Sequence, residues 1–473
     1  MDGPLSFNEK SEFIRFASQN NIKIVNLCHI PEDGRLKTLS FSVTEKGRLD
    51  GILDFGERVD GSSLFSFIEP GKSDIYVRPR LDKAFVNPFA TVPTINVLCD
   101  YLDEQGEPLK IAPRNILARA EEKLFSSSKI VLKALAELEF YVMSEPETKI
   151  LFPAAEDNNY HESAPFARFE NLRNEVLTTL ADLGIATKYG HSEVGKLADR
   201  NGTIIEQHEI EFTIRDLRET AETITLAKWI IRSTCEKHGV SASFSPKIAM
   251  EHAGTGMHIH LCGSINNRNV VSDSDRSLTA DARKMIGGIL KFAPSLAAFG
   301  NPTPVSYLRF IARKESPTHV CWGARNRLAL IRIPLWWSFA ENKEKPRSHI
   351  ETFEYRAPDA FANAYLLFAG IAVAVDYGLR NPDEALRTAE DLRVETADDE
   401  KKKTDVLPCS CEESAKNLEK DRRFYEADGV FPSKLIDKTI ENLKTYKDKG
   451  LWKELANKPN EVERLLRQYL HYG

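Results

Sequence analysis

The sequence predicts an α+β fold in which a small N-terminal domain of helices and strands precedes a larger domain. Its 473 residues suit two or more domains, or one large α/β unit with a smaller partner. The first hundred residues contain strand-like runs around a turn, and strands alternate with helices afterwards. Several later strand-like runs carry polar residues at every second position, which indicates a sheet with one polar face.

The small N-terminal domain is predicted from turn signals and alternating apolar residues. Residues 6–9 read Ser-Phe-Asn-Glu, which fits a capping box and predicts a helix ending near Asn20. The remaining predictions are strands at 22–30, 36–43 and 94–100, a turn at 31–34, and a linker at 103–108.

The larger domain is predicted to alternate strands and helices, and its C-terminal part to be mostly helical and strongly charged. Pro113 suits the first turn of a helix, where its missing N–H costs nothing. Helices are predicted at 113–124, 166–183, 217–238 and 278–299, with a buried helix at 364–375, and strands at 129–143, 203–214, 240–248 and 257–263.

Composition and charge exclude several classes of protein. The net charge of −6 argues against a general affinity for nucleic acid. The longest apolar run, 364–375, is too short to span a bilayer, and the N-terminus lacks a secretory signal. The seven cysteines are scattered without a Cys-x-x-Cys pair, which favours reduced thiols. We therefore expect a cytoplasmic protein.

Pairs of polar residues with the period of a strand indicate a metal site. Two residues that are two positions apart on a strand point to the same face. Each pair alone is explained by a solvated strand face or by core histidines, but three pairs together favour convergence on a divalent cation. The pairs are Glu137 with Glu139, Glu209 with Glu211, and His258 with His260, which follows a glycine-containing segment.

One apparent phosphate-binding motif is rejected. Residues 190–196 fit the first seven positions of a P-loop, but Leu197 has no hydroxyl for Mg²⁺. Glu193 inside the loop would also repel a phosphate. We keep Glu193 as a candidate metal ligand instead.

Arginines are dense in residues 301–334 and recur in 353–359. Their planar guanidinium groups suit recognition of carboxylate and phosphate beside a metal. Glu354 and Arg356 are predicted to share a strand face. The alternative is a surface arginine whose stem covers apolar neighbours, which we expect for Arg325.

These segments resemble, in order, the motifs of the glutamine synthetase family along most of the chain. Any one of them is weak, but the whole ordered set is specific. The segments are Asp-Gly-Ser-Ser at 60–63, Ser-Asp at 73–74, Glu-Leu-Glu-Phe at 137–140, His-Ser-Glu-Val at 191–194, Gln-His-Glu-Ile at 207–210, Gly-Thr-Gly-Met-His-Ile-His at 254–260, Asn-Pro-Thr at 301–303, Ser-Tyr at 306–307, Glu-x-Pro at 315–317, Asn-Arg at 326–327, Arg-Ile-Pro at 332–334 and Glu-x-Arg-x-Pro-Asp at 354–359.

The resemblance implies two Mg²⁺ or Mn²⁺ sites and a role for each matched residue. The implied metal ligands are Glu139, Glu193 and Glu209 for one ion, and Glu137, His258 and Glu354 for the other. The implied substrate contacts are His260 and Arg332 with ATP, and Arg309, Arg356 and Gly254 with glutamate. The implied catalytic residues are Arg327 and Arg332 at the transferring phosphoryl group, Glu315 on a flap, and Asp60 of a neighbouring subunit at the ammonium ion.

The resemblance also implies the activity and architecture. ATP would phosphorylate glutamate to γ-glutamyl phosphate, which ammonia would convert to glutamine. Residues 1–108 would form a β-grasp domain and residues 109–473 a catalytic domain, whose mainly antiparallel active-site sheet is flanked by helices. The chains would assemble into a ring-shaped homo-oligomer, which the resemblance suggests is a dodecamer. No nucleic acid or membrane is expected as a partner.

Departures from the family pattern leave the acceptor amine open. Ala253 replaces an asparagine, Cys262 lies where a serine is common, Ser192 replaces a histidine and Glu206 a glycine. Together with the Glu-Leu-Glu-Phe-Tyr strand, Ala253 resembles relatives that join glutamate to larger amines. Ammonia is the preferred prediction, and a larger amine or polyamine is the alternative.

Two other classes stay open. A catalytically inactive structural relative is disfavoured because candidates are present at all six metal positions. A kinase of the creatine type, with a related sheet, is disfavoured by the Asp-Gly-Ser-Ser segment and by Glu315.

Overall fold

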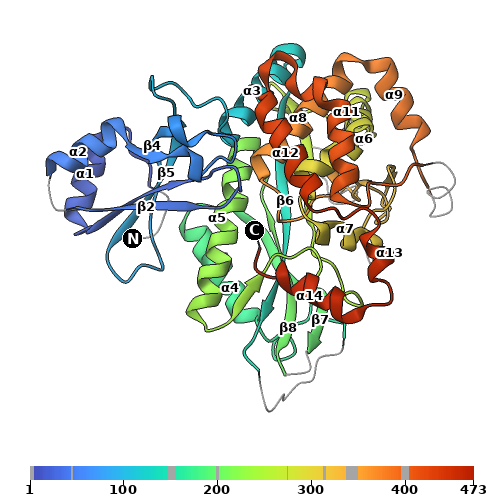
Figure 1. The fold of residues 1–473 in the computed structure, drawn as a ribbon, viewed down its shortest axis with the longest axis horizontal. Helices are drawn as coiled ribbons and strands as arrows, with labels where there is room; N and C mark the ends of the chain where they lie inside the picture. Colours follow the sequence, from blue (N-terminus) through green and yellow to red (C-terminus); the bar gives the residue numbers. More distant parts are fainter. Residues whose placement is uncertain are drawn as a thin grey trace.

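The protein has a small N-terminal domain beside a much larger domain, as Figure 1 shows. This computed structural model describes residues 5–43, 46–146, 156–198, 202–273, 275–312, 316–336, 350–395 and 404–472. Both domains combine a sheet with helices, so the predicted α+β class is confirmed.

The N-terminal domain is a five-stranded sheet with two helices. The strands lie in the order β2-β1-β5-β4-β3, with β1 and β5 parallel and the other neighbours antiparallel. Phe13, Val25 and Val97 are fully buried in its core. The elements are α1 (Lys10–Gln19), β1 (Ile24–His29), β2 (Lys37–Ser42), α2 (Lys46–Phe55), β3 (Glu57–Asp60), β4 (Asp74–Val86) and β5 (Thr94–Leu102).

The larger domain is built on a ten-stranded sheet with the main order β13-β14-β15-β11-β6-β8-β7. Neighbours are antiparallel apart from β13 and β14. The strands are β6 (Val131–Met143), β7 (Thr187–Ala198), β8 (Ile204–Phe212), β9 (Arg215–Asp216), β10 (Ser241–Ser243), β11 (Met257–Ile265), β12 (Arg268–Asn269), β13 (Trp322–Ala324), β14 (Ile331–Ile333) and β15 (Phe353–Tyr355).

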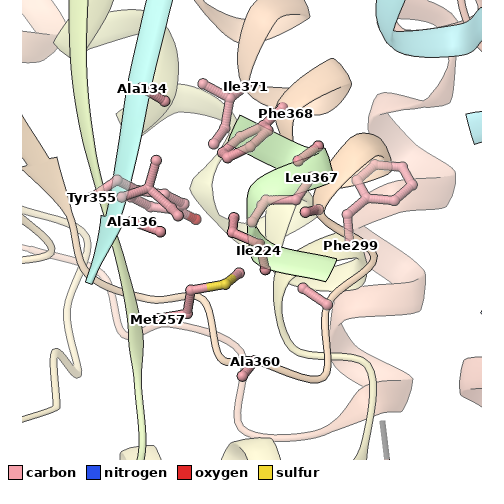
Figure 2. Packing of buried hydrophobic residues seen from close by; sticks show 14 of the residues in the cluster. Ala134, Ala136, Ile224, Met257, Phe299, Tyr355, Ala360, Leu367, Phe368 and Ile371 are labelled. Carbon is pink, nitrogen blue, oxygen red and sulfur yellow. The ribbon is translucent and has the colours of Figure 1, made fainter. Parts of the chain in front are cut away.

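Helices cover one face of this sheet and leave the other face for polar groups. Figure 2 shows Ala134 and Ala136 of β6 packed near Ile224 and the helical side chains Leu367 and Phe368. Because strand residues alternate between faces, Glu137 and Glu139 point away from this core. The helices are α3 (Pro113–Ser128), α4 (Glu170–Asp182), α5 (Leu217–Lys237), α6 (Ala280–Gly300), α7 (Pro304–Ile311), α8 (Ala364–Arg380), α9 (Pro382–Asp391), α11 (Cys411–Glu426), α12 (Ser433–Thr445), α13 (Leu451–Leu455) and α14 (Pro459–Gln468).

Several predicted boundaries are wrong. The capping box does not form, because Glu9 is the N-cap of α1 and the Asn8 N–H donates to Glu12 instead. Helix α4 begins at Glu170, four residues after its predicted start, and the strand predicted at 240–248 is only three residues long. Strand β7 was not predicted. It contains the P-loop-like segment, so the rejection of a P-loop is confirmed.

The apolar run that begins at Ala364 forms α8, as predicted, and most of its side chains are buried. Among the helices that the structure describes, none has the length and apolar character that crossing a bilayer requires.

Candidate active site

A cavity of about 210 Å³ lies on the polar face of the large sheet. Strands β6, β7, β8 and β11 contribute carboxylates and imidazoles to it, and arginines come from α7, from β14 and from the segments before β14 and after β15. Of the predicted site residues, those that line it are Glu137, Glu139, Glu193, Glu209, Gly254, His258, His260, Arg309, Arg327, Arg332 and Arg356.

Strand pairing brings the first group of candidate ligands together. Strand β11 places His258 directly opposite Glu137 of β6. His258 Nδ1 lies 3.0 Å from one carboxylate oxygen of Glu137, and His260 Nε2 lies 2.8 Å from the other. Burial opposes ionisation of Glu137, but His260 and His258 outweigh it and hold the pKa of this carboxyl well below its usual range. Glu354 is fully buried next to this group, and one of its carboxylate oxygens lies 3.5 Å from His258 Nδ1.

The second group surrounds Glu209 of β8. Strand β7 places His191 opposite Glu209, and His191 Nε2 lies 3.2 Å from its carboxylate. His191 Nδ1 lies 3.6 Å from Glu193. Burial and then the nearby carboxylates of Glu137, Glu139 and Glu193 raise the pKa of Glu209 well above its usual range. Like charges therefore converge here in a buried place, where a bound cation would relieve their repulsion.

The donor atoms fit divalent metal ions. Within each of three sets, one carboxylate oxygen or imidazole nitrogen per residue lies within 4.8 Å of the others. Carboxylate oxygens with imidazole suit Mg²⁺ and Mn²⁺. The sets are Glu137 with His260 and Glu354, Glu137 with Glu209 and His258, and His191 with Glu193 and Glu209. His260, which was expected at the nucleotide, thus also lies among the candidate metal ligands.

Glu354 is held by two arginines under the cavity. Arg332 Nη1 donates to its carboxylate at 2.8 Å, and Arg356 Nη1 donates to its other oxygen. Burial opposes ionisation of Glu354, but Arg356 outweighs it and keeps its pKa below the usual value. The two guanidinium groups are therefore fixed in direction by the carboxylate between them.

Arg309 is held by backbone oxygens instead. Its Nη1 donates to the carbonyl of Ala357 at 2.9 Å, and its Nη2 donates to the carbonyl of Arg356 at 3.2 Å. A Cβ added at Gly254 would lie 2.9 Å from Arg309 Cγ, and one added at Gly256 would lie 2.6 Å from Arg309 Nη2. The two glycines therefore leave the room that Arg309 occupies.

The predicted catalytic residue Asp60 does not line this cavity. Asp60 is an exposed residue of the N-terminal domain, and its carboxylate accepts hydrogen bonds from the Ser62 N–H and from the hydroxyls of Ser62 and Ser63. These bonds lower the pKa of Asp60. The chain does not bring Asp60 to its own cavity, as far as the described residues show. Glu315 lies outside the described residues.

Some cavity residues, such as Lys188 and His191, were not predicted as site residues, whereas Glu211 was predicted only as the strand partner of Glu209. Glu211 is almost fully buried, and Lys188 Nζ lies 2.7 Å from its carboxylate. His191 stands two positions from the candidate ligand Glu193, so the strand period that paired Glu209 with Glu211 would also have paired these two residues.

The departures from the family pattern lie behind or beside the cavity. Ser192 and Glu206 are fully buried on the far face of β7 and β8, where Ser192 accepts from Arg173. The Ala253 carbonyl accepts from the Tyr141 hydroxyl, and Cys262 is buried in the core. None of the four departures lines the cavity as the described residues form it.

Comparisons with known proteins agree with this architecture. A family model described as "Glutamine synthetase, catalytic domain" matches residues 110–465, and one described as "Glutamine synthetase, beta-Grasp domain" matches residues 21–104. The second match confirms the predicted β-grasp domain.

Curated relatives and solved structures extend the likeness over nearly the whole chain. The chain is 30% identical to a glutamine synthetase of Thermotoga maritima over 97% of its length and 98% of the relative. It is 31% identical to a glutamine synthetase of Pyrococcus horikoshii over 86% of each. The fold is similar to that of Plasmodium falciparum glutamine synthetase, with a TM-score of 0.79 at 20% identity over 94% of this chain and 97% of that one. It is also similar to a structure titled "GmaS/ADP complex", with a TM-score of 0.73 at 22% identity over 92% and 96% of the two chains.

Proposed function

The chain belongs to the glutamine synthetase family, and from this premise we propose that it is an ATP-dependent ligase that forms glutamine from glutamate and ammonia. The observation that carries the proposal is the cavity itself, where buried carboxylates and imidazoles face four arginines. Transfer of a phosphoryl group to a carboxylate is helped by metal ions and by positively charged side chains, because both reactants carry negative charge.

The carboxylate and imidazole groups of the cavity would hold two Mg²⁺ or Mn²⁺ ions. Glu139, Glu193 and Glu209 are proposed for the ion on the glutamate side. Glu137, His258 and Glu354 are proposed for the ion on the nucleotide side. When bound, the ions offset the charge of the phosphate oxygens.

The arginines are proposed to orient the two substrates. Arg309 and Arg356 would bind the carboxylates of glutamate, with Gly254 supplying a backbone contact, and both guanidinium groups are already fixed in direction. Arg327 and Arg332 would bind the phosphoryl group as it moves, and His260 would contact the phosphates of ATP. This arrangement would bring the γ-carboxylate of glutamate into line with the γ-phosphate.

The reaction then has two balanced steps. An oxygen of the γ-carboxylate attacks the γ-phosphorus of ATP, and the bond to ADP breaks. The nitrogen of ammonia attacks the acyl carbon, and the carbon–oxygen bond breaks to release phosphate with the oxygen that came from glutamate. The proton that the nitrogen loses in this step leaves with the phosphate as hydrogen phosphate. Ammonium must lose a proton first, and Asp60 of a neighbouring subunit is proposed to accept it. Glu315 is proposed to close the site against water.

The proposal extends to the assembly. Because Asp60 is exposed and absent from its own cavity, a neighbouring N-terminal domain would complete each site in a ring of heterologous contacts. We also propose a domain boundary at residue 108, which falls between the ranges that the two family models match.

A larger primary amine is the second candidate acceptor. The supporting observation is that Tyr160 and Tyr189, about half exposed, line the cavity beside Glu193 and Glu211. Aromatic faces beside carboxylates suit an organic ammonium ion. An apolar slot would gain about 0.8 kcal/mol per buried methylene, or about fourfold in affinity for each.

One comparison separates the two acceptors. The values of kcat/KM for ammonium, methylamine, ethylamine and putrescine are measured at fixed ATP, glutamate and Mg²⁺. The proposal predicts the highest value for ammonium, because a site built for that ion excludes longer chains. Values that rise with chain length would replace ammonia by a larger amine and leave the ligase chemistry in place.

A further inference from the structure

Strand β7 has a bulge at Glu193, the residue whose side chain lines the cavity. Ser192 pairs with His208, and the next pair is Lys196 with Glu206. The three residues 193–195 therefore face the single residue Gln207 of β8. Bulges next to active sites redirect side chains, and they leave backbone groups without their ladder partners.

The side chain of Gln207 occupies this bulge and hydrogen-bonds in three directions. Its Oε1 accepts from the Gly195 N–H at 2.9 Å. Its Nε2 donates to Glu139 Oε2 at 3.0 Å and to the Gly254 carbonyl at 2.9 Å. Gln207 is 1% exposed, so water does not compete for these bonds. One amide thus joins the bulge, a candidate metal ligand and a candidate substrate contact.

Gly195 makes room for this amide. A Cβ at position 195 would lie 2.6 Å from Gln207 Oε1 and 2.0 Å from the hydroxyl oxygen of Tyr141. The Tyr141 hydroxyl donates to the carbonyl of Ala253, directly before Gly254. The bulge and the glycine segment are therefore packed against each other through Tyr141 and Gln207.

Gln207 also fixes the direction of the Glu139 carboxylate. Glu139 Oε2 accepts a second hydrogen bond, from the Gly256 N–H at 2.8 Å. With Oε2 held by these two donors, Oε1 is turned toward His258, whose Nε2 lies 3.7 Å away. Glu139 thus presents Oε1 to the group of candidate ligands, while Oε2 stays hydrogen-bonded to Gln207 and Gly256.

We propose that Gln207 is a positioning residue that sets the orientation of Glu139 and the course of the β7 bulge for metal binding. This inference rests on the proposed function, because it assumes that Glu139 and Glu193 bind a divalent ion. Groups that hydrogen-bond to metal ligands typically contribute 10- to 100-fold to metal affinity.

The test is a calorimetric titration of the full-length protein with Mn²⁺, without ATP or glutamate. Gln207→Met keeps the length of the side chain and removes every hydrogen bond. Gln207→Asn keeps the amide but is one methylene too short to reach both the bulge and Glu139. Each variant is expected to bind Mn²⁺ about 10- to 100-fold more weakly than the wild type. The KM for glutamate is expected to rise as well, because the Gly254 carbonyl loses the same partner.

A matched control removes another buried amide far from the cavity. Asn96 is 2% exposed in the N-terminal sheet and accepts a hydrogen bond from Asn26. Asn96→Leu is expected to lower the melting temperature while leaving the Mn²⁺ affinity at the wild-type value. This control separates a loss of metal affinity from a general loss of stability.

The outcomes distinguish this inference from the proposed function. Wild-type Mn²⁺ affinity in a folded Gln207→Met protein, or in Gln207→Asn if the first does not fold, overturns the inference alone. A wild-type protein that takes up no Mn²⁺ overturns the metal sites of the proposed function and the inference together. Weaker binding by the Gln207 variants, with unchanged binding by Asn96→Leu, supports the inference whichever amine is the acceptor.

Discussion

Replacing Gly256 by alanine should impair glutamate binding while the fold survives. The added Cβ would lie 2.6 Å from Arg309 Nη2 and 2.9 Å from His258 Nε2. Ordinary contacts begin near 3.4 Å, so the guanidinium must move by about 0.8 Å. Its 3.2 Å hydrogen bond to the Arg356 carbonyl would then break. Because the guanidinium is the end of a side chain, it can turn without moving the backbone.

The expected loss follows from this displacement. A misplacement of about 1 Å in a binding group can lower the rate about 100-fold. That factor corresponds to about 2.7 kcal/mol in the free energy of the transition state. We therefore expect kcat/KM for glutamate to fall about 100-fold in Gly256→Ala, mainly through KM, with a melting temperature close to that of the wild type.

Steady-state kinetics with glutamate as the varied substrate, together with thermal melting, test this prediction. The matched control is Gly51→Ala in α2, where an added Cβ meets no atom within 4 Å. Alanine there should leave KM unchanged and stabilise the helix by about 0.5–1 kcal/mol. A Gly256→Ala enzyme with the wild-type KM for glutamate would refute the argument that the glycine leaves room for Arg309.

Three further predictions concern other parts of the molecule. Burial and then Arg232 lower the pKa of Lys228 to about 7, so between pH 7 and 10 the unfolded chain binds more protons than the folded one. The stability of the wild type relative to Lys228→Met should therefore rise with pH, by at most about 1.4 kcal/mol per unit. Melting temperatures of both proteins from pH 6 to 9 check this, and a constant difference would contradict it. His258→Ala should weaken ATP binding more than glutamate binding, because it removes a proposed ligand of the ion on the nucleotide side, and unchanged ATP affinity and turnover would remove His258 from the site. Asp60→Ala and Glu315→Ala should each be inactive, whereas hybrids mixed in equal amounts should regain up to about a quarter of the activity, because sites between subunits draw one residue from each neighbour. A monomer with full activity would contradict the prediction that each site is shared between two subunits.

Much of the site was predictable because its ligands lie on strands. Glu137 and Glu139 share a face of β6, and His258 faces Glu137 across the β6–β11 pair. The two-residue period alone indicates such a cluster, and the ordered motifs indicate which family it belongs to. The α+β class and most long elements, such as β6 and α5, were predictable for the same reason, because their apolar positions repeat regularly.

The remainder depends on contacts between segments that are distant in sequence. Strand β7 was missed because Gly190 and Gly195 interrupt its pattern, although Gly195 is needed for the approach of Gln207 and Tyr141. The fixing of Arg309 by the carbonyls of 356 and 357 joins α7 to the segment after β15, and no local pattern reveals it.

The most direct test of the proposed function follows an oxygen atom. Glutamate labelled with ¹⁸O in its γ-carboxylate is incubated with ATP, Mg²⁺, ammonium and the enzyme, and the phosphate and amide products are analysed by mass spectrometry. If the γ-carboxylate attacks ATP, each molecule of glutamine formed must be accompanied by one phosphate that carries a single ¹⁸O. Phosphate without label, or ATP consumption without glutamine or another γ-glutamyl amide, would contradict the proposed ligase chemistry.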